Sequence, residues 1–358
     1  MIDDFFSRNP FELSKSEKEK LLTKELLELT EHHIDKCPEY KKIVEALGYD
    51  KSKVSSYYDL PFIPVRLFKN QELLSIPRAE VFKTMTSSGT SGQAVSKIFV
   101  DKETASNQQK ALIKIMSNFI GNKRLPMLII DSPNVVKDRN MFSARGAAIL
   151  GLRMFGRDCI YALNENMELN LPLVEEFIEK HKDENMLIFG FTFMVWQHLY
   201  SKLKALNVKL NLPNAYLVTG GGWKKLVSLN ISNDDFREAL NEQCGIGHFV
   251  DHYGMVEQTG CIYAQCECGH LHASIYSDVI PRRANDFSVC NIGEKGIIQV
   301  VSVLPHSYPG HSLLTEDEGI ILGEDDCPCG RKGKYFKLTG RIKQAELRGC
   351  SDTYAAKF

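Results

Sequence analysis

The sequence of 358 residues lacks an excess of charge of either sign. Lys and Arg together number 44 against 45 for Asp and Glu, which gives a net charge of −1. A chain balanced in this way has no overall field that would gather nucleic acid or an anionic membrane. We therefore expect no nucleic-acid partner, and any partner must be recognised by a local site.

Long apolar runs are also missing. The longest run, Met186 to Trp196, is about half of the ~20 residues that a membrane-spanning helix needs. The first twenty residues contain no apolar stretch of the kind found in secretory signals. We expect no membrane span and a cytoplasmic location. With 43% hydrophobic and 25% charged residues, the composition is that of a globular protein and excludes a disordered or fibrous chain.

Ten cysteines are too few for a disulfide scaffold in a chain of this length, and in a reducing compartment clustered cysteines favour metal binding or catalysis. Two Cys-x-Cys pairs are each followed by a glycine, which admits a tight turn around a metal ion. They predict a structural Zn²⁺ site with ligands Cys266, Cys268, Cys327 and Cys329 and with His270 or His272 as a spare ligand. The alternative is four free thiols on neighbouring loops.

The patterning along the chain predicts an α/β fold in four regions. Leucines at helical spacing indicate a helical N-terminal segment, and the two prolines of Leu60 to Phe68 indicate an extended connector or edge strand. Apolar runs then alternate with helical segments, which is typical of a sheet with crossover helices, and Gly-punctuated β runs follow. The expected boundaries are 1–80 for helices and connector, 81–260 for an α/β nucleotide-binding core, 261–340 for a β-rich subdomain with the cysteine cluster, and 341–358 for a hinge and short tail.

Within the core, the expected strands and helices are short and regularly spaced. The predicted buried strands are Met127–Ile130, Met186–Phe189 and Ala215–Val218, and the predicted helices are 102–120, 168–181, 193–207 and 233–243.

The segment Thr86-Ser-Ser-Gly-Thr-Ser-Gly92 is the sharpest local signal for chemistry. Its hydroxyl and backbone N–H groups can surround polyphosphate oxygens without adding negative charge, and its glycines allow close backbone approach. It is not a Walker A loop, because no Gly-Lys-Ser/Thr follows. The alternative is a flexible Ser/Gly turn.

Two further segments could complete a nucleotide site. In Asp251-His-Tyr-Gly-Met-Val-Glu257, an aromatic face could meet a purine and a carboxylate could hold Mg²⁺, although a packed aromatic and a solvated acid are the commoner outcome. Thr219-Gly-Gly-Gly222 follows an apolar run, so its backbone could approach a flat ring, or it is a plain strand-to-helix loop.

Taken in order, and together with Thr315-Glu-Asp317 and Gly340-Arg341, these segments resemble the adenylate-forming superfamily, and within it the LuxE-type acyl-protein synthetases. The likeness covers nearly the whole chain, including Leu60 to Lys69 and Gly340 to Cys350. It implies the large α/β domain of those enzymes and the use of ATP and Mg²⁺. It implies that phosphates are bound by Ser87, Ser88, Gly89, Thr90, Ser91 and Gly92, adenine by Gly221, Gly222, Tyr253 and Gly254, Mg²⁺ by Glu257, and ribose by Asp317 and Arg341.

The sequence departs from the superfamily at two lysines. The lysine expected shortly after the phosphate loop falls on Val95, with Lys97 two places later. Only 17 residues follow Arg341, so we expect the usual mobile lid domain with its catalytic lysine to be largely absent, and Lys343 or Lys224 is a candidate replacement.

Cys350 lies apart from the cysteine pairs. A thiol beside Arg348 could have a lowered pKa and act as a nucleophile, or it could be an ordinary free cysteine. The synthetases that the chain resembles carry their acyl group on a cysteine near the C-terminus, and Cys350 is the best positional match.

The expected function is ATP-dependent activation of a carboxylic acid, fatty acyl by the resemblance, followed by transfer to a thiol and then to an acyl reductase or acyl carrier. The alternatives are an acyl- or aryl-CoA ligase of the phenylacetate-CoA ligase type and a nucleotide-binding subunit without turnover. The sequence leaves the acyl chain, the final acceptor and the oligomeric state open.

Overall fold

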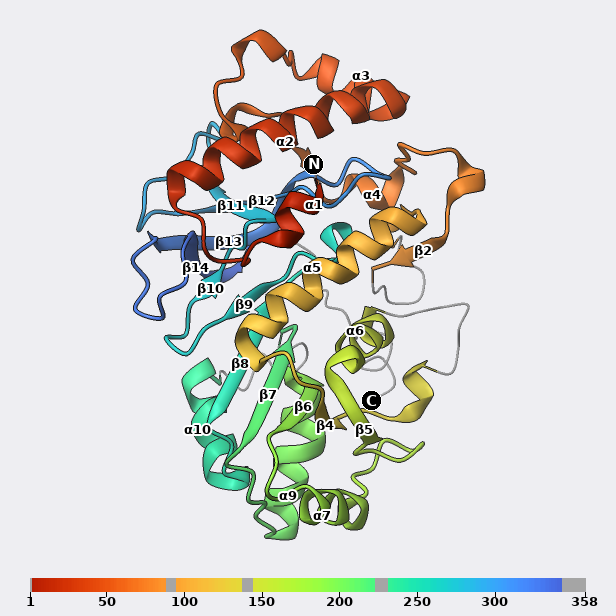
Figure 1. The fold of residues 1–358 in the computed structure, drawn as a ribbon, viewed down its shortest axis with the longest axis vertical. Coiled ribbons are helices and arrows are strands. Elements are labelled where there is room, and N and C mark those ends of the chain that lie inside the picture. The colour runs from red at the N-terminus through yellow and green to blue at the C-terminus, as the bar shows by residue number, and fades with distance from the viewer. Residues whose placement is uncertain (1, 88–94, 137–143, 223–230, 343–358) are drawn as a thin grey trace. The chain divides into compact units, whose positions relative to one another are not determined.

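The computed structural model describes residues 2–87, 95–136, 144–222 and 231–342 (Figure 1). The chain divides into two compact units. Among the described residues, the first unit contains 2–87, 95–118 and 254–342, and the second contains 119–136, 144–222 and 231–253.

The second unit is a parallel sheet with strand order β8-β7-β6-β4-β5. Helices join successive strands, as the alternation of apolar runs and helical patterns predicts. The strands are β4 (Leu125–Ile129), β5 (Gly156–Tyr161), β6 (Met186–Phe191), β7 (Ala215–Gly220) and β8 (His248–Tyr253). The helices are α6 (Ala144–Leu152), α7 (Leu171–Lys180), α8 (Thr192–Met194), a π-helical turn (Val195–Tyr200), α9 (Ser201–Leu206) and α10 (Asn233–Cys244). The prediction of an α/β fold is confirmed.

The first unit carries the antiparallel strands that the Gly-punctuated β runs predict. Their order is β11-β12-β13-β14-β10-β9, and β2 (Lys83–Thr86) and β3 (Lys97–Val100) form a separate antiparallel pair. The remaining bounds are β9 (Tyr263–Gln265), β10 (Leu271–His272), β11 (Ser277–Arg282), β12 (Lys295–Ser302), β13 (Ser312–Glu324) and β14 (Lys334–Arg341).

The N-terminal helices are confirmed as well. α1 (Ile2–Ser7) precedes α2 (Lys15–Lys36) and α3 (Pro38–Ala46), and Cys37 separates α2 from α3, which begins at a proline. A capping box between Ser14 and Glu17 starts α2, since each satisfies a backbone N–H that the first helical turn leaves free. Leu22, Leu26 and Leu29 of α2 are buried. The long helix α5 (Lys102–Ile120) also belongs largely to this unit.

The connector after these helices is part strand and part helix. Ile63–Pro64 forms β1, which pairs in parallel with β13, and Leu67–Asn70 forms the single-turn helix α4. The two prolines therefore keep only the first half extended. The short 3-10 turns are Lys51–Lys53, Tyr57–Asp59, Arg78–Glu80, Pro133–Val136, Arg153–Phe155 and Val256–Gln258.

A buried ionic cluster fastens α2 to the strands of the first unit. The Asp278 carboxylate on β11 accepts hydrogen bonds from Lys334 Nζ on β14 at 2.8 Å and from Lys18 Nζ on α2 at 3.4 Å, and the Tyr57 hydroxyl donates to it as well. The side chains of Lys18, Asp278 and Lys334 are only 4%, 1% and 8% exposed. One carboxylate thus lies between two buried ammonium groups.

In the part of the chain that the structure describes, no helix combines the length and the apolar character needed to cross a membrane.

Candidate active site and metal centre

The predicted phosphate loop connects the two strands of the β2–β3 hairpin. Thr86 pairs with Lys97 at its end, the Ser87 N–H donates to the Ser96 carbonyl at 3.1 Å, and the Ser96 N–H donates to Ser87 Oγ at 2.9 Å. The predicted phosphate ligands Ser88, Gly89, Thr90, Ser91 and Gly92 lie outside the described residues. Ser87 is thus held at the base of the hairpin, where the loop begins.

Glu257, predicted as the Mg²⁺ ligand, is buried in the 3-10 turn Val256–Gln258 of the first unit. Burial raises the pKa of its carboxyl, while the Ser96 hydroxyl and the charges of Lys69 and Arg341 partly oppose the rise. The Tyr308 hydroxyl fixes the turn by donating to the Glu257 carbonyl at 3.0 Å. A buried carboxyl whose ionised form is stabilised by nearby positive charge is a suitable ligand for a divalent cation.

The two residues predicted to bind ribose are neighbours across two strands. Asp317 on β13 pairs in register with Arg341 at the end of β14, and Arg341 Nε donates to Asp317 Oδ1 at 3.0 Å. Thr315 accepts from the Asp317 N–H at 3.1 Å and donates to the Ile298 carbonyl at 2.7 Å. The structure therefore brings together two motifs that are 24 residues apart in sequence.

Three of the four predicted adenine residues, Gly221, Gly222 and Tyr253, lie in the second unit, at the carboxyl ends of parallel strands, where open α/β sheets commonly bind ligands. Gly221 follows β7 with a φ of +76°, and a Cβ there would lie 2.9 Å from the Phe191 ring, so this position requires glycine. The Thr192 hydroxyl, which the sequence analysis did not single out, donates to the Gly221 carbonyl at 3.0 Å. Gly222 is exposed and Tyr253 ends β8 half-buried. Gly254, which is also exposed, belongs to the first unit.

Lys343, Lys224 and Cys350 lie outside the described residues, so their predicted roles stay predictions.

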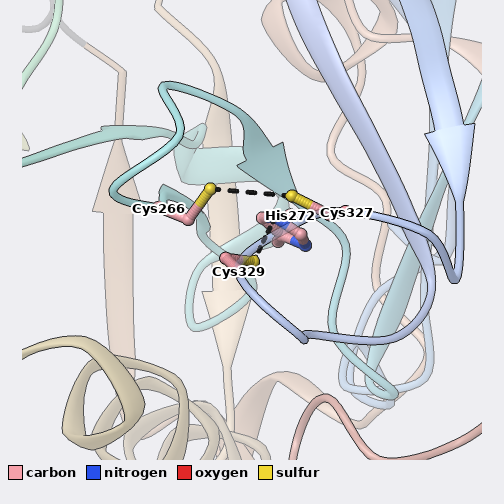
Figure 2. Close-up of side chains that lie close together, drawn as sticks. All are labelled: Cys266, His272, Cys327 and Cys329. Atoms are coloured by element: carbon pink, nitrogen blue, oxygen red, sulfur yellow. Dashed lines mark hydrogen bonds between the residues drawn. The ribbon is translucent and has the colours of Figure 1, made fainter.

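Three of the four predicted zinc ligands lie together with a histidine in the first unit (Figure 2). The ligand atoms of Cys266, His272, Cys327 and Cys329 all lie within 4.8 Å of one another. Cys266 Sγ is 4.0 Å from Cys327 Sγ, and Cys329 Sγ is 3.4 Å from His272 Nε2. Ligands of a tetrahedral zinc, with bonds of about 2.0–2.3 Å, lie about 3.5–3.8 Å apart, so the spacing fits this metal.

Two turns of the same kind present these sulfurs. The Gly269 N–H donates to the Cys266 carbonyl and the Gly330 N–H donates to the Cys327 carbonyl, both at 2.9 Å and with φ values of +79° and +81°. Cys268 is exposed and is not part of the group, so the first turn contributes only Cys266. His272, on the buried strand β10, is the fourth potential ligand.

The pKa shifts of His272 and Cys329 suit a metal, whereas burial raises the pKa of the Cys266 thiol to about 11 and raises that of the Cys327 thiol as well. Burial lowers the pKa of His272 to about 4, which leaves the imidazole neutral, as a zinc ligand must be. Burial raises the pKa of the Cys329 thiol, but hydrogen bonds from the backbone and side chain of Arg331 outweigh this effect and bring the pKa below its ordinary value. His270 Nδ1 lies 3.3 Å from Cys327 Sγ and is a fifth potential ligand.

Comparison with known proteins gives a consistent result over the full length. The sequence matches the family described as "Acyl-protein synthetase, LuxE" over residues 1–358. The long-chain-fatty-acid–luciferin-component ligase of Vibrio harveyi is 22% identical over 369 residues, covering 100% of this chain and 93% of that protein. The protein of the same name from Photorhabdus luminescens is 35% identical over 92 residues, covering 25% of this chain and 78% of that protein.

Among solved structures, an open conformation of 2-hydroxyisobutyryl-CoA ligase, in complex with its acyl-adenylate and CoA, superimposes with a TM-score of 0.71 at 15% identity. The match covers 95% of this chain and 79% of that one. At this identity the likeness establishes the fold, which is that of the adenylate-forming ligases.

Proposed function

Because the chain belongs to the LuxE family of acyl-protein synthetases, we propose that it activates a long-chain fatty acid with ATP and transfers the acyl group to its own Cys350. The chain is an adenylate-forming ligase, which favours turnover over a nucleotide-binding role alone. The fatty acid is proposed from the names of its relatives, which are long-chain-fatty-acid ligases.

The observation that carries this proposal is the convergence of three motifs in the first unit. Arg341 donates to Asp317, its charge also opposes the rise in the pKa of the buried Glu257 carboxyl, and Ser87 and Ser96 are hydrogen-bonded at the base of the β2–β3 hairpin. The proposed ribose-binding pair, the proposed cation ligand and the hairpin that carries the proposed phosphate loop thus all belong to the first unit. An ATP molecule needs these three functions in one place.

In the first half-reaction, a carboxylate oxygen of the fatty acid attacks the α-phosphorus of ATP. The bond from this phosphorus to the bridging oxygen breaks, and pyrophosphate leaves with the electron pair. Asp317 and Arg341 hold the ribose, and the phosphate loop N–H groups and hydroxyls stabilise the charge that develops on the phosphoryl oxygens. Mg²⁺, held by Glu257 when bound, would neutralise phosphate charge.

In the second half-reaction, a thiolate attacks the carbonyl carbon of the acyl-adenylate. The bond between this carbon and the phosphate oxygen of AMP breaks, and AMP leaves with the electron pair. We propose Cys350 as this thiolate and an acyl reductase or acyl carrier as the later recipient. The alternative acceptor is coenzyme A. The Cys266–His272–Cys327–Cys329 group would hold Zn²⁺ as a structural ion, since four protein ligands leave no open position for substrate.

Carboxylate-dependent exchange of radioactive pyrophosphate into ATP tests the first half-reaction. Wild type should exchange only with a fatty acid present, and Asp317→Asn should raise the KM for ATP. Glu318→Gln, on the same strand and paired with Lys295, is the matched control and should behave as wild type. Absence of exchange with any fatty acid would overturn the proposal.

Labelling with radioactive fatty acid tests the second half-reaction. Wild type should acquire a label that hydroxylamine removes, and Cys350→Ser should keep exchange but lose the label. A labelled Cys350→Ser protein would exclude this residue as carrier. An unlabelled wild type that acylates coenzyme A would favour the CoA ligase.

A further inference from the structure

The connector that follows the N-terminal helices runs beside the strand that presents the ribose-binding residues. Ile63 and Pro64 of β1 pair in parallel with Leu313 and Leu314 of β13, and the Val65 N–H donates to the Leu314 carbonyl at 2.9 Å. The next residue of the connector, Arg66, thereby arrives beside the segment Thr315 to Asp317. No part of the proposed function yet uses this arginine.

Arg66 binds Glu316, the middle residue of that segment. Its Nε donates to Glu316 Oε1, and the Glu316 side chain is only 9% exposed. The other oxygen, Glu316 Oε2, lies 3.9 Å from Arg341 Nη2. One carboxylate therefore faces two guanidinium groups, and one of these also binds Asp317.

This arrangement places Glu316 in competition with Asp317 for Arg341. A largely buried carboxylate without a counter-charge is unfavourable, so it would draw the nearest cation toward itself. Arg66 supplies that counter-charge from the other side. Arg341 consequently stays at 3.0 Å from Asp317 and at 3.9 Å from Glu316.

We propose that Arg66 is a positioning residue for the nucleotide site: by neutralising Glu316, it keeps Arg341 on Asp317 in the orientation that binds ribose. This inference rests on the proposed function of the Asp317–Arg341 pair. Residues just after the connector act on other predicted parts of the site, since the charge of Lys69 acts on Glu257 and Glu72 pairs with Lys97 of β3 at 3.6 Å. The connector is thus a component of the site and not a spacer.

The test compares Arg66→Met with Lys295→Met in the pyrophosphate exchange assay. Lys295 is the matched control, because it pairs at 3.0 Å with Glu318, two residues along the same strand, and its side chain is similarly exposed at 53% against 48%. Arg66→Met should raise the KM for ATP about fivefold with little change in kcat, since it weakens binding that ground and transition states share. Lys295→Met should leave both unchanged.

Two readouts separate a positioning role from a general structural one. Wild type should bind 2′-deoxyATP less well than ATP, and Arg66→Met should lose much of this discrimination because its ribose contacts are already weakened. Adding Glu316→Gln to Arg66→Met should restore the KM for ATP to within about twofold of wild type, since the competing charge is gone. Arg66→Lys, which keeps the charge, provides a second variant with a smaller expected rise in KM.

The outcomes are distinguishable. If wild type shows no exchange, the proposed function fails and this inference fails with it. If wild type exchanges normally but Arg66→Met keeps its KM for ATP, keeps its discrimination against 2′-deoxyATP, or is not rescued by Glu316→Gln, the inference alone is overturned.

Discussion

The buried ionic cluster makes a sharp prediction about stability. Asp278→Asn keeps the shape of the side chain but removes the negative charge that lies between Lys18 and Lys334. Both ammonium groups are almost fully enclosed, so water cannot replace the lost carboxylate. We expect the variant to fold less stably than wild type, because buried charges without a partner are strongly unfavourable.

The magnitude follows from the burial of the two lysines. Removing one partner of a buried ion pair costs about 3–5 kcal/mol of unfolding free energy. In a unit of 150–250 residues, each kcal/mol lowers the melting temperature by about 2–4 °C, so the expected fall is about 6–20 °C. Adding Lys18→Met should recover part of the loss, since it removes one of the two unpaired charges.

The pH dependence gives a second signature. In wild type, burial acts to raise the pKa of Asp278, but the charges of Lys18 and Lys334 and hydrogen bonds from Lys334 and Tyr57 lower it to about 2, against an ordinary value of 3.8. Its stabilisation is therefore complete above the ordinary value and is lost as the pH falls through about 2. In Asp278→Asn, the buried lysines hold protons less tightly when folded than when unfolded. The loss of unfolding free energy relative to wild type should therefore become smaller as the pH rises toward about 10.4, the pKa of free lysine.

Differential scanning calorimetry and urea unfolding at several pH values measure both effects. Glu28→Gln on the exposed side of α2 makes the same carboxylate-to-amide exchange and should leave the melting temperature unchanged. A melting temperature for Asp278→Asn equal to that of wild type, or a deficit that grows as the pH rises, would refute the reasoning.

Three further predictions concern the candidate sites. Protein purified without chelator should contain about one zinc per chain, and Cys327→Ser should lower both zinc content and melting temperature while Cys268→Ser changes neither; elemental analysis that finds no zinc would contradict this. Glu257→Gln should raise the Mg²⁺ concentration for half-maximal exchange at least about tenfold, and an unaltered Mg²⁺ titration would count against the assignment. Ser88→Ala combined with Thr90→Ala should weaken ATP binding in isothermal titration, and unchanged affinity would mean that the loop does not bind phosphates.

The pattern of elements could be predicted well because it depends on local periodicity. The apolar run Met186–Phe189 lies within β6, and the helix predicted over 102–120 coincides with α5. The secondary structure of the connector was harder to predict, because its prolines exclude a helix only at their own positions. Leu67–Asn70 lies beyond them and forms α4.

The candidate sites contain contacts that could not be predicted from the sequence. Cys266-Glu-Cys268 and Cys327-Pro-Cys329 have the same spacing, yet the first turn contributes one sulfur to the group and the second contributes two. Spacing does not specify the direction of each side chain out of a turn. Similarly, no periodic pattern links Arg66 to Glu316, which is 250 residues away, since only the register of β1 against β13 brings them together.

The pairing of β1 with β13 also has a consequence for the order in which the chain folds during synthesis. The described residues of the second unit all lie between 119 and 253, so this part can become compact soon after it leaves the ribosome. The first unit can complete its fold only later, because its N-terminal helices and β1 need strands that are translated last. Until then α2 can pack only against early segments such as α3 and the turn Tyr57–Asp59, so part of its apolar face is open to chaperones. A ribosome-bound chain halted before β13 should therefore resist protease in its middle while its N-terminal segment is still cleaved.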